Sequence, residues 1–140
     1  ASGFEVDLVR EMAGRWFRDA SAAQFIPLAA DRFAAALAEG VIDLAIGGIQ
    51  RTGARERAMD FSAATFNSGG APLGIALPMN DSALRDLVNL TLQDMQADGA
   101  YARIFQRWFP DQAVNEIERW PGSSPGIESL LAPPTPTPIP

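Results

Sequence analysis

Residues 42–62 read IDLAIGGIQRTGARERAMDFS, and this stretch decides the fold. The segment 41–49 is β-branched and almost continuously apolar, which is the pattern of a parallel strand buried on both faces. It runs into Gly47 and Gly48, and Thr52 is then placed to cap a short helix. Because open α/β sheets bind ligands beyond the carboxyl ends of their strands, the same stretch predicts where a site lies.

Further elements are predicted on both sides of this strand. Apolar residues at spacings of three and four indicate an amphipathic helix over 4–17. Pro27 limits the apolar run 24–28 to an edge strand or a strand end, and Asp31 can cap a helix over 32–39. Strand, helix and strand in this order favour a βαβ unit with a right-handed crossover. The later predicted elements are a buried strand over 73–77, a long helix capped by Asp81 or Ser82 that continues to residue 97, a break at Gly99 and a short helix over 101–109.

Length and composition narrow the possible functions. The 140 residues, 47% of them hydrophobic, suffice for one packed domain. A net charge of -6 and a pI of about 4.5 argue against a nucleic-acid partner. The chain contains no Cys, His or Lys, so all 11 basic residues are arginine. Thiol, Ser/His and Schiff-base catalysis and the usual zinc sites are therefore excluded, and no cofactor or metal is expected.

The sequence shows no membrane-spanning segment or signal pattern, and it ends in a proline-rich extension. No apolar run approaches the roughly 18 to 20 residues of a membrane span, and the N-terminus lacks a signal pattern, so the chain is expected to be soluble and either mature or trimmed. The composition turns rich in proline after Trp120 and ends in PPTPTPIP. We expect a lobe over 1–112 and an extension over 113–140, which is either a disordered terminus or a linker to another module.

Four segments in a fixed order carry a resemblance to a known family. They are GFEVDLVREM from Gly3, the triplet at 31–33 with Leu37 and Gly40, the stretch 42–62, and the pair LGIALPMND from Leu73 and LQDMQADGAYARIFQRWF from Leu92. Together they resemble the bacterial extracytoplasmic solute-binding proteins for polar amino acids, family 3, which have the type II periplasmic binding fold.

The resemblance implies the fold class and what the chain lacks. The expected structure is α/β, a single lobe with a mostly parallel sheet flanked by helices, built from a first segment 3–68 and a returning segment 72–109. The family begins with a further strand before the segment at Gly3, and its second lobe stands where this chain has only residues 69–71. The first lobe alone is therefore expected, with the first strand and the second lobe missing.

The resemblance also implies the ligand-binding residues. Arg55, three residues after Thr52, is expected to hold the carboxylate of a free amino acid as a bidentate cation. Gln50 is expected to add its backbone N–H, and Gly48 to offer its carbonyl to the ligand's ammonium group. From residue type alone, an arginine-rich loop is more often a solvated face, and Gly47 fits packing as well as close approach of a ligand.

Two more positions have weaker implied roles. Ala30 stands where several relatives place an aromatic residue that stacks on the ligand's side chain. Phe66 stands where the family often has tyrosine at the entry to the hinge, and packing in the core is the more common fate of such an aromatic residue.

The expected function is amino-acid binding by a lobe of an ABC-transporter solute-binding protein, not catalysis. The isolated lobe is expected to bind weakly or not at all, because closure of two lobes excludes water and strengthens polar contacts. The alternatives are an extracytoplasmic sensor domain, a dehydratase-like enzyme of the same fold, and a fragment with no function of its own. The implied partners are an amino acid and a membrane ABC permease, in the periplasm or outside the cell, with a possible lipid or membrane tether. The gap left by the missing strand also predicts either self-association or a rearranged sheet.

Overall fold

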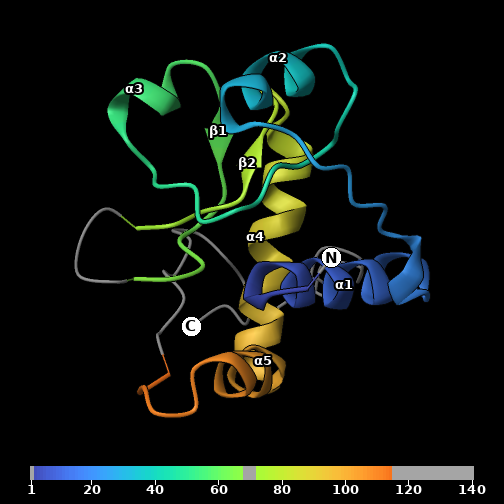
Figure 1. Cartoon of the computed structure of the whole chain (residues 1–140). Helices are drawn as coiled ribbons and strands as arrows, with labels where there is room; N and C mark the ends of the chain where they lie inside the picture. Colours follow the sequence, from blue (N-terminus) through green and yellow to red (C-terminus); the bar gives the residue numbers. More distant parts are fainter. Residues whose placement is uncertain (1, 68–71, 115–140) are drawn as a thin grey trace, which may run out of the picture.

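The computed structural model describes residues 2–67 and 72–114, and the residues it describes form an α/β lobe rich in helices. Helix α4 crosses the whole lobe, with α2, α3 and the sheet at one end and α1 and α5 toward the other (Figure 1). The elements are α1 (Phe4–Phe17), η1 (Ala20–Ala22), η2 (Ala30–Arg32), α2 (Phe33–Ala38), α3 (Gly53–Glu56), β1 (Asp60–Phe61), β2 (Ala76–Leu77), α4 (Ser82–Ala97) and α5 (Ala100–Trp108). No helix within the described ranges combines the length and hydropathy that a membrane crossing requires.

Helix α1 has the bounds that its apolar periodicity predicts. Its buried residues Phe4, Leu8 and Met12 are spaced four apart and so share one face. Glu5 and Asp7 in the first turn and Arg15 in the last turn suit the helix dipole. The apolar face and the charges at both ends therefore both favour a helix over these residues.

Helices α4 and α5 also agree with the sequence. The Asp81 carboxylate accepts a hydrogen bond from the backbone N–H of Leu84 at 3.1 Å and caps α4, as predicted. Gly99, with a positive φ of 87°, separates α4 from α5. The Asp98 carboxylate accepts from the N–H of Ala100 at 3.0 Å and pairs with the Arg15 guanidinium at 2.7 Å. This pair fastens the α4–α5 turn to α1.

Asp98 is the acidic group in this turn whose ionisation is perturbed. Burial opposes its charged form, but the hydrogen bond from Ala100 and the positive charge of Arg15 outweigh burial and hold the pKa of Asp98 below its ordinary value. The folded lobe therefore favours the ionised carboxylate at this position.

The sheet differs from the one expected. Strands β1 and β2 pair antiparallel, with Asp60 opposite Leu77. The segment 41–49 contributes one antiparallel bridge, at Ala45, and 24–28 forms no strand. The α/β lobe is confirmed, but the mostly parallel pairing and the βαβ unit are wrong for the described residues. An extended apolar segment becomes a strand only along a continuous hydrogen-bonding neighbour; 41–49 is bonded to residues 74–76 at Ala45 and Ile49 alone, and 24–28 has no paired strand among the described residues.

The predicted cap at Asp31 is wrong, and two predicted segments lie outside the described residues. Asp31 is exposed within η2 rather than capping a helix, because α2 begins at Phe33 after Arg32 and has no side-chain cap. The expectations for residues 69–71 and for 115–140 of the proline-rich extension lie outside the described residues.

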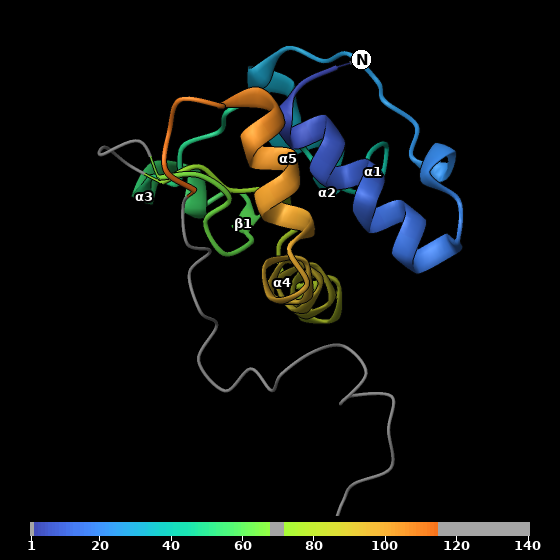
Figure 2. The same ribbon diagram turned by 90° about the horizontal axis from the view of Figure 1, so that it is seen from below.

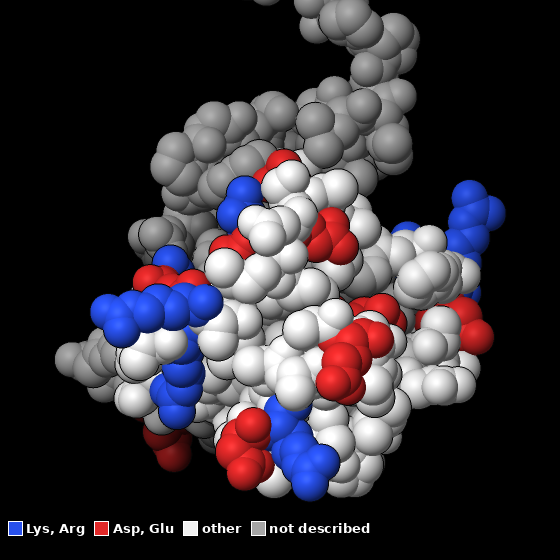
Figure 3. Space-filling model, turned by 90° about the horizontal axis from the view of Figure 1, so that it is seen from above, with Lys and Arg blue, Asp and Glu red and all other residues white. Residues whose placement is uncertain are grey.

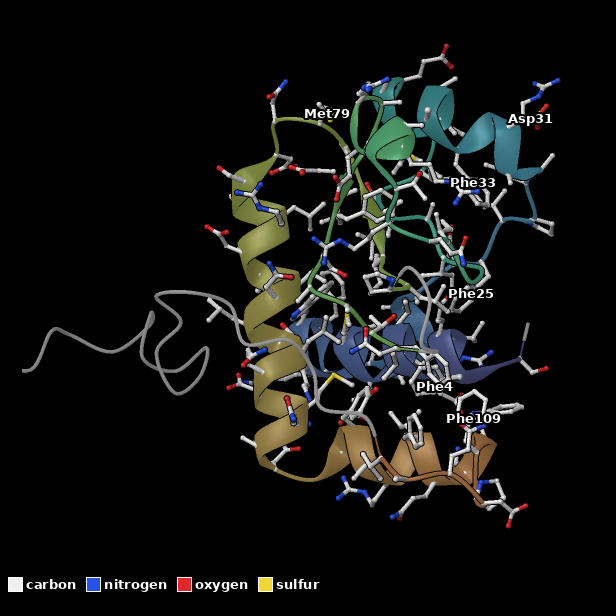
Figure 4. The ribbon with its side chains drawn as sticks, turned by 90° about the vertical axis from the view of Figure 1, so that its left-hand side faces the viewer. Phe4, Phe25, Asp31, Phe33, Met79 and Phe109 are labelled. Carbon is white, nitrogen blue, oxygen red and sulfur yellow. The ribbon has the colours of Figure 1, made fainter. Side chains whose placement is uncertain are left out.

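The main core joins the first and last helices of the described chain. Phe4 makes edge-to-face contacts with four aromatic rings, whose centroids lie 5.4–6.1 Å away: Phe66, Tyr101, Phe105 and Phe109. Figure 2 shows α1 and α5 side by side with α4 seen end-on, and Figure 4 shows Phe4 and Phe109 facing each other between α1 and α5. A second cluster, around Leu37, Met59 and Phe61, joins α2 to the sheet.

Tyr101 is the polar member of the aromatic core. It is 1% exposed, and its hydroxyl donates a hydrogen bond to the carbonyl oxygen of Thr65 at 2.7 Å. Burial raises the pKa of the Tyr101 hydroxyl above its ordinary value. The folded lobe therefore holds this side chain in its neutral form.

Candidate functional site

The loop at 47–48 is open and has a backbone that requires glycine. Gly47 has φ 137° and Gly48 has φ 69°, both in the region that residues with a side chain rarely adopt. A Cβ added at either position would meet no described heavy atom within 4 Å. Close packing therefore does not explain Gly47 among the described residues, and the exposed loop leaves room for a ligand.

A carboxylate of the same chain holds this loop from within. Oε2 of Glu5, in the first turn of α1, accepts hydrogen bonds from the N–H of Gly47 at 2.6 Å and from the N–H of Gly48 at 3.0 Å. Glu5 was not singled out from the sequence, because it lies 42 residues from Gly47 and no local pattern connects the two. The one sequence signal that includes Glu5 is the segment GFEVDLVREM, which carries part of the family resemblance.

Arg55, Thr52 and Gln50 form a second group just beyond the loop. The Thr52 hydroxyl accepts from the backbone N–H of Arg55 at 3.3 Å and caps α3, as the sequence predicts. The Arg55 guanidinium donates from Nη1 to the carbonyl oxygen of Gln50 at 3.1 Å. The Arg55 side chain, carried by the short helix α3, therefore contacts the backbone just before that helix.

The backbone around Gln50 determines which way its own N–H points. The carbonyl of Ile49 accepts from the N–H of Gly74 at 3.1 Å, and the N–H of Arg51 donates to the carbonyl of Pro72 at 2.9 Å. Because each peptide is planar and trans, the N–H and C=O of Gln50 both point away from residues 72–74. The Gln50 N–H thus shares a side of the backbone with the carbonyl that Arg55 contacts.

A separate cavity lies near this group. It measures about 370 Å³ and is lined by Arg51, Glu56, Ala64, Asn67 and Pro72. The Arg51 side chain crosses Gly74, where an added Cβ would come within 3.1 Å of its Cδ, and approaches Glu56 at 3.7 Å. None of the predicted ligand-binding residues lines this cavity.

The structure brings some predicted site residues together and separates others. Glycines 47 and 48 meet at the Glu5 carboxylate, and Gln50, Thr52 and Arg55 form the second group. Ala30 lies on η2 and is exposed. Phe66 packs against Phe105 at 5.9 Å in the aromatic core, which agrees with the packing role.

Charge and metal ligands add little to this site. Basic and acidic side chains are interspersed over the face seen in Figure 3, without a large area of one sign. Asp60 pairs with Arg85 at 3.1 Å and so has a structural partner. Within residues 2–67 and 72–114, no group of three His, Cys, Asp or Glu side chains could hold a metal ion.

Solved structures share this fold. An ancestral arginine-binding protein bound to glutamine is 19% identical with a TM-score of 0.70, covering 78% of this chain and 88% of that one. The arginine-bound form of domain 1 from TmArgBP is 26% identical with a TM-score of 0.55, covering 64% and 72%. The substrate-binding protein of an amino acid ABC transporter is 13% identical with a TM-score of 0.67, covering 78% and 88%.

The comparison with family models identifies the chain more directly. No curated protein matches it. A model of the bacterial extracellular solute-binding proteins, family 3, matches residues 1–111. This match covers most of the chain, and the fold agrees with it. The chain therefore belongs to the bacterial extracellular solute-binding proteins of family 3.

Proposed function

We propose that this lobe binds a free amino acid, with Arg55 and the backbone N–H of Gln50 holding the ligand's carboxylate. The observation that carries the proposal is the contact of the Arg55 guanidinium with the Gln50 carbonyl at 3.1 Å. It brings a fixed cation and a backbone donor to the same side of one residue. A planar guanidinium and an N–H donor are complementary to the two oxygens of a carboxylate.

The other site residues have supporting roles in this proposal. Thr52 caps α3 and so orients the backbone that carries Arg55. The open glycine loop offers the Gly48 carbonyl to the ligand's ammonium group, and Gly47 allows close approach. Ala30 remains a predicted neighbour of the ligand's side chain, and Phe66 supports the site from the aromatic core.

One solved structure supports binding by a single lobe. Domain 1 from TmArgBP, 26% identical to this chain, has an arginine-bound form. Gly48, Gln50 and Arg55 are exposed here, so water competes for each polar group and screens the charge. We therefore propose that the lobe binds an amino acid weakly, without turnover.

The family supports a cellular setting for this activity. Its members are extracellular proteins, which agrees with a periplasmic or extracellular location. We propose that the amino acid is passed to a membrane ABC permease and that a lipid or membrane tether holds the protein near it. We propose further that residues 1–112 form the binding lobe and 113–140 an extension.

Self-association is a further part of the proposal. The segment 24–28 pairs with no strand of the described chain, and its β-branched Ile26 is 54% exposed. Unpaired extended backbone with exposed β-branched side chains pairs readily with another chain. We propose that a second copy pairs here.

Calorimetric titration with L-arginine and L-glutamine tests amino-acid binding. We expect Arg55→Ala to weaken L-arginine binding about 10- to 100-fold, because a hydrogen bond to a charged group contributes about 1.5–3 kcal/mol. Arg57→Ala is the matched control, since Arg57 is exposed and two positions away. Agmatine, which lacks the carboxylate, should bind the wild type and Arg55→Ala equally. Equal binding of L-arginine to both proteins would refute the role of Arg55.

A further inference from the structure

The Glu5 carboxylate occupies a concave pair of backbone donors. Two successive N–H groups, of Gly47 and Gly48, converge on its Oε2 at 2.6 and 3.0 Å. Successive N–H groups that converge in this way form a site for an anion. Here the anion is the Glu5 carboxylate of the chain itself, so these two donors are already occupied.

This contact also determines where a carbonyl of the loop points. In a planar trans peptide the C=O of one residue is antiparallel to the N–H of the next. Because the Gly48 N–H points at Glu5, the Gly47 C=O points away from Glu5. A hydrogen bond to an ionised acceptor polarises the peptide and makes that carbonyl oxygen a better acceptor. The loop thus presents a strengthened acceptor opposite the carboxylate.

Glu5 differs from the other carboxylates of α1 in having no cationic partner among the described residues. Asp7 lies 3.8 Å from Arg10 and 3.4 Å from Arg107, and Glu11 lies 3.0 Å from Arg15. Glu5 makes no such pair, and its second oxygen, Oε1, is buried without a hydrogen-bond partner. The negative charge behind the loop is therefore not neutralised by a neighbouring side chain.

We propose that Glu5 is a positioning residue that makes the 47–48 loop selective for ligands with an α-ammonium group. It orients the Gly47 carbonyl as a second acceptor for the ammonium group, in addition to the Gly48 carbonyl of the proposed function, and its uncompensated charge favours a cation at the loop. This inference rests on the proposed function, since it concerns the same ligand. It accounts for ammonium recognition by the described lobe itself, with Arg55 at the opposite end of the ligand's main chain.

The test compares L-arginine with 5-guanidinopentanoate, which is the same molecule without the α-amino group. Glu5→Gln keeps an oxygen that can accept from Gly47 and Gly48 but removes the charge. We expect it to weaken L-arginine binding about fivefold, because a charged acceptor forms a hydrogen bond about twice as strong as a neutral one. Binding of 5-guanidinopentanoate should not change. Glu39→Gln, an exposed site at the end of α2, is the control for net charge.

Each result has a defined meaning. An equal loss for both ligands would show a purely structural role and overturn the proposal, as would no loss for either ligand. The wild type alone gives a second test that does not depend on the variant folding: it should prefer L-arginine to 5-guanidinopentanoate at least fivefold, and equal binding would overturn the proposal. If the wild type binds L-arginine saturably and Glu5→Gln binds it with the same affinity, the role of Glu5 is refuted and the proposed function stands. Absence of any wild-type binding removes the proposed function with it.

Discussion

Replacement of Tyr101 by phenylalanine should change how stability depends on alkaline pH. Tyr101 is the single tyrosine of the chain, which also has no lysine or cysteine. Burial raises the pKa of its hydroxyl in the folded lobe, whereas the unfolded chain ionises near its ordinary value of about 10. Below that pH both states hold the proton, and the full stability is present. Above it the unfolded chain releases a proton that the folded lobe retains.

The size of the effect follows from these two states. The free energy of unfolding of the wild type should be flat from pH 8.5 to about 10 and then fall by about 1.4 kcal/mol per pH unit. Arginine stays protonated throughout this range and adds no slope. Tyr101→Phe loses the hydrogen bond to the Thr65 carbonyl, 2.7 Å long and buried, at a cost of about 1–2 kcal/mol below pH 10. Its own curve should stay flat, so the two curves should cross near about pH 11.

Urea unfolding followed by tryptophan fluorescence at half-unit steps of pH measures both curves. Absorbance of the phenolate near 295 nm shows independently whether the hydroxyl ionises only as the lobe unfolds. A wild-type curve that stays flat to pH 11.5 would refute the reasoning. The same alkaline slope in Tyr101→Phe would assign the effect to another group and refute it equally.

Two further predictions concern acid stability and association. The pKa of Asp98 is lowered in the folded lobe, so its contribution to stability is present above the ordinary pKa and is lost as the pH falls through the folded value. In urea titrations Asp98→Asn should therefore lose less stability than the wild type between pH 5 and 3. The difference should stay below about 1 kcal/mol because the side chain is 49% exposed, and an unchanged acid profile would contradict this role of Asp98. Sedimentation velocity should show concentration-dependent association that Ile26→Glu weakens and Met79→Glu does not, and a wild type that remains monomeric would contradict strand pairing.

The helices were predictable because their causes are local. The helix over 4–17 follows from one apolar stripe, and the caps at Thr52 and Asp81 follow from side chains that reach the next turn. The segments 24–28 and 41–49 have the composition of strands but depend on a neighbouring chain segment for hydrogen bonds. Their apolar pattern does not reveal whether that neighbour is present. The prediction failed where structure depends on partners distant in sequence.

The candidate site divides in the same way. Thr52 and Arg55 lie within one turn, and their relation could be predicted from spacing. Gln50 required the bonds of its neighbours to residues 72–74 before the direction of its N–H was known. Glu5 was missed because the contact with Gly47 joins the first helix to a loop 42 residues later. A contact of that kind leaves no periodic or spaced signal in a single sequence.

The packing of Phe4 against α5 sets the order in which the lobe can be completed. Three of the four aromatic rings that contact Phe4 come from residues 101 to 109, so the covering of Phe4 stays incomplete until this segment has been synthesised. A ribosome-bound chain that stops before Ala100 therefore lacks these rings and leaves Phe4 open to solvent or to a chaperone. Contacts between such distant segments also slow the folding of the finished chain.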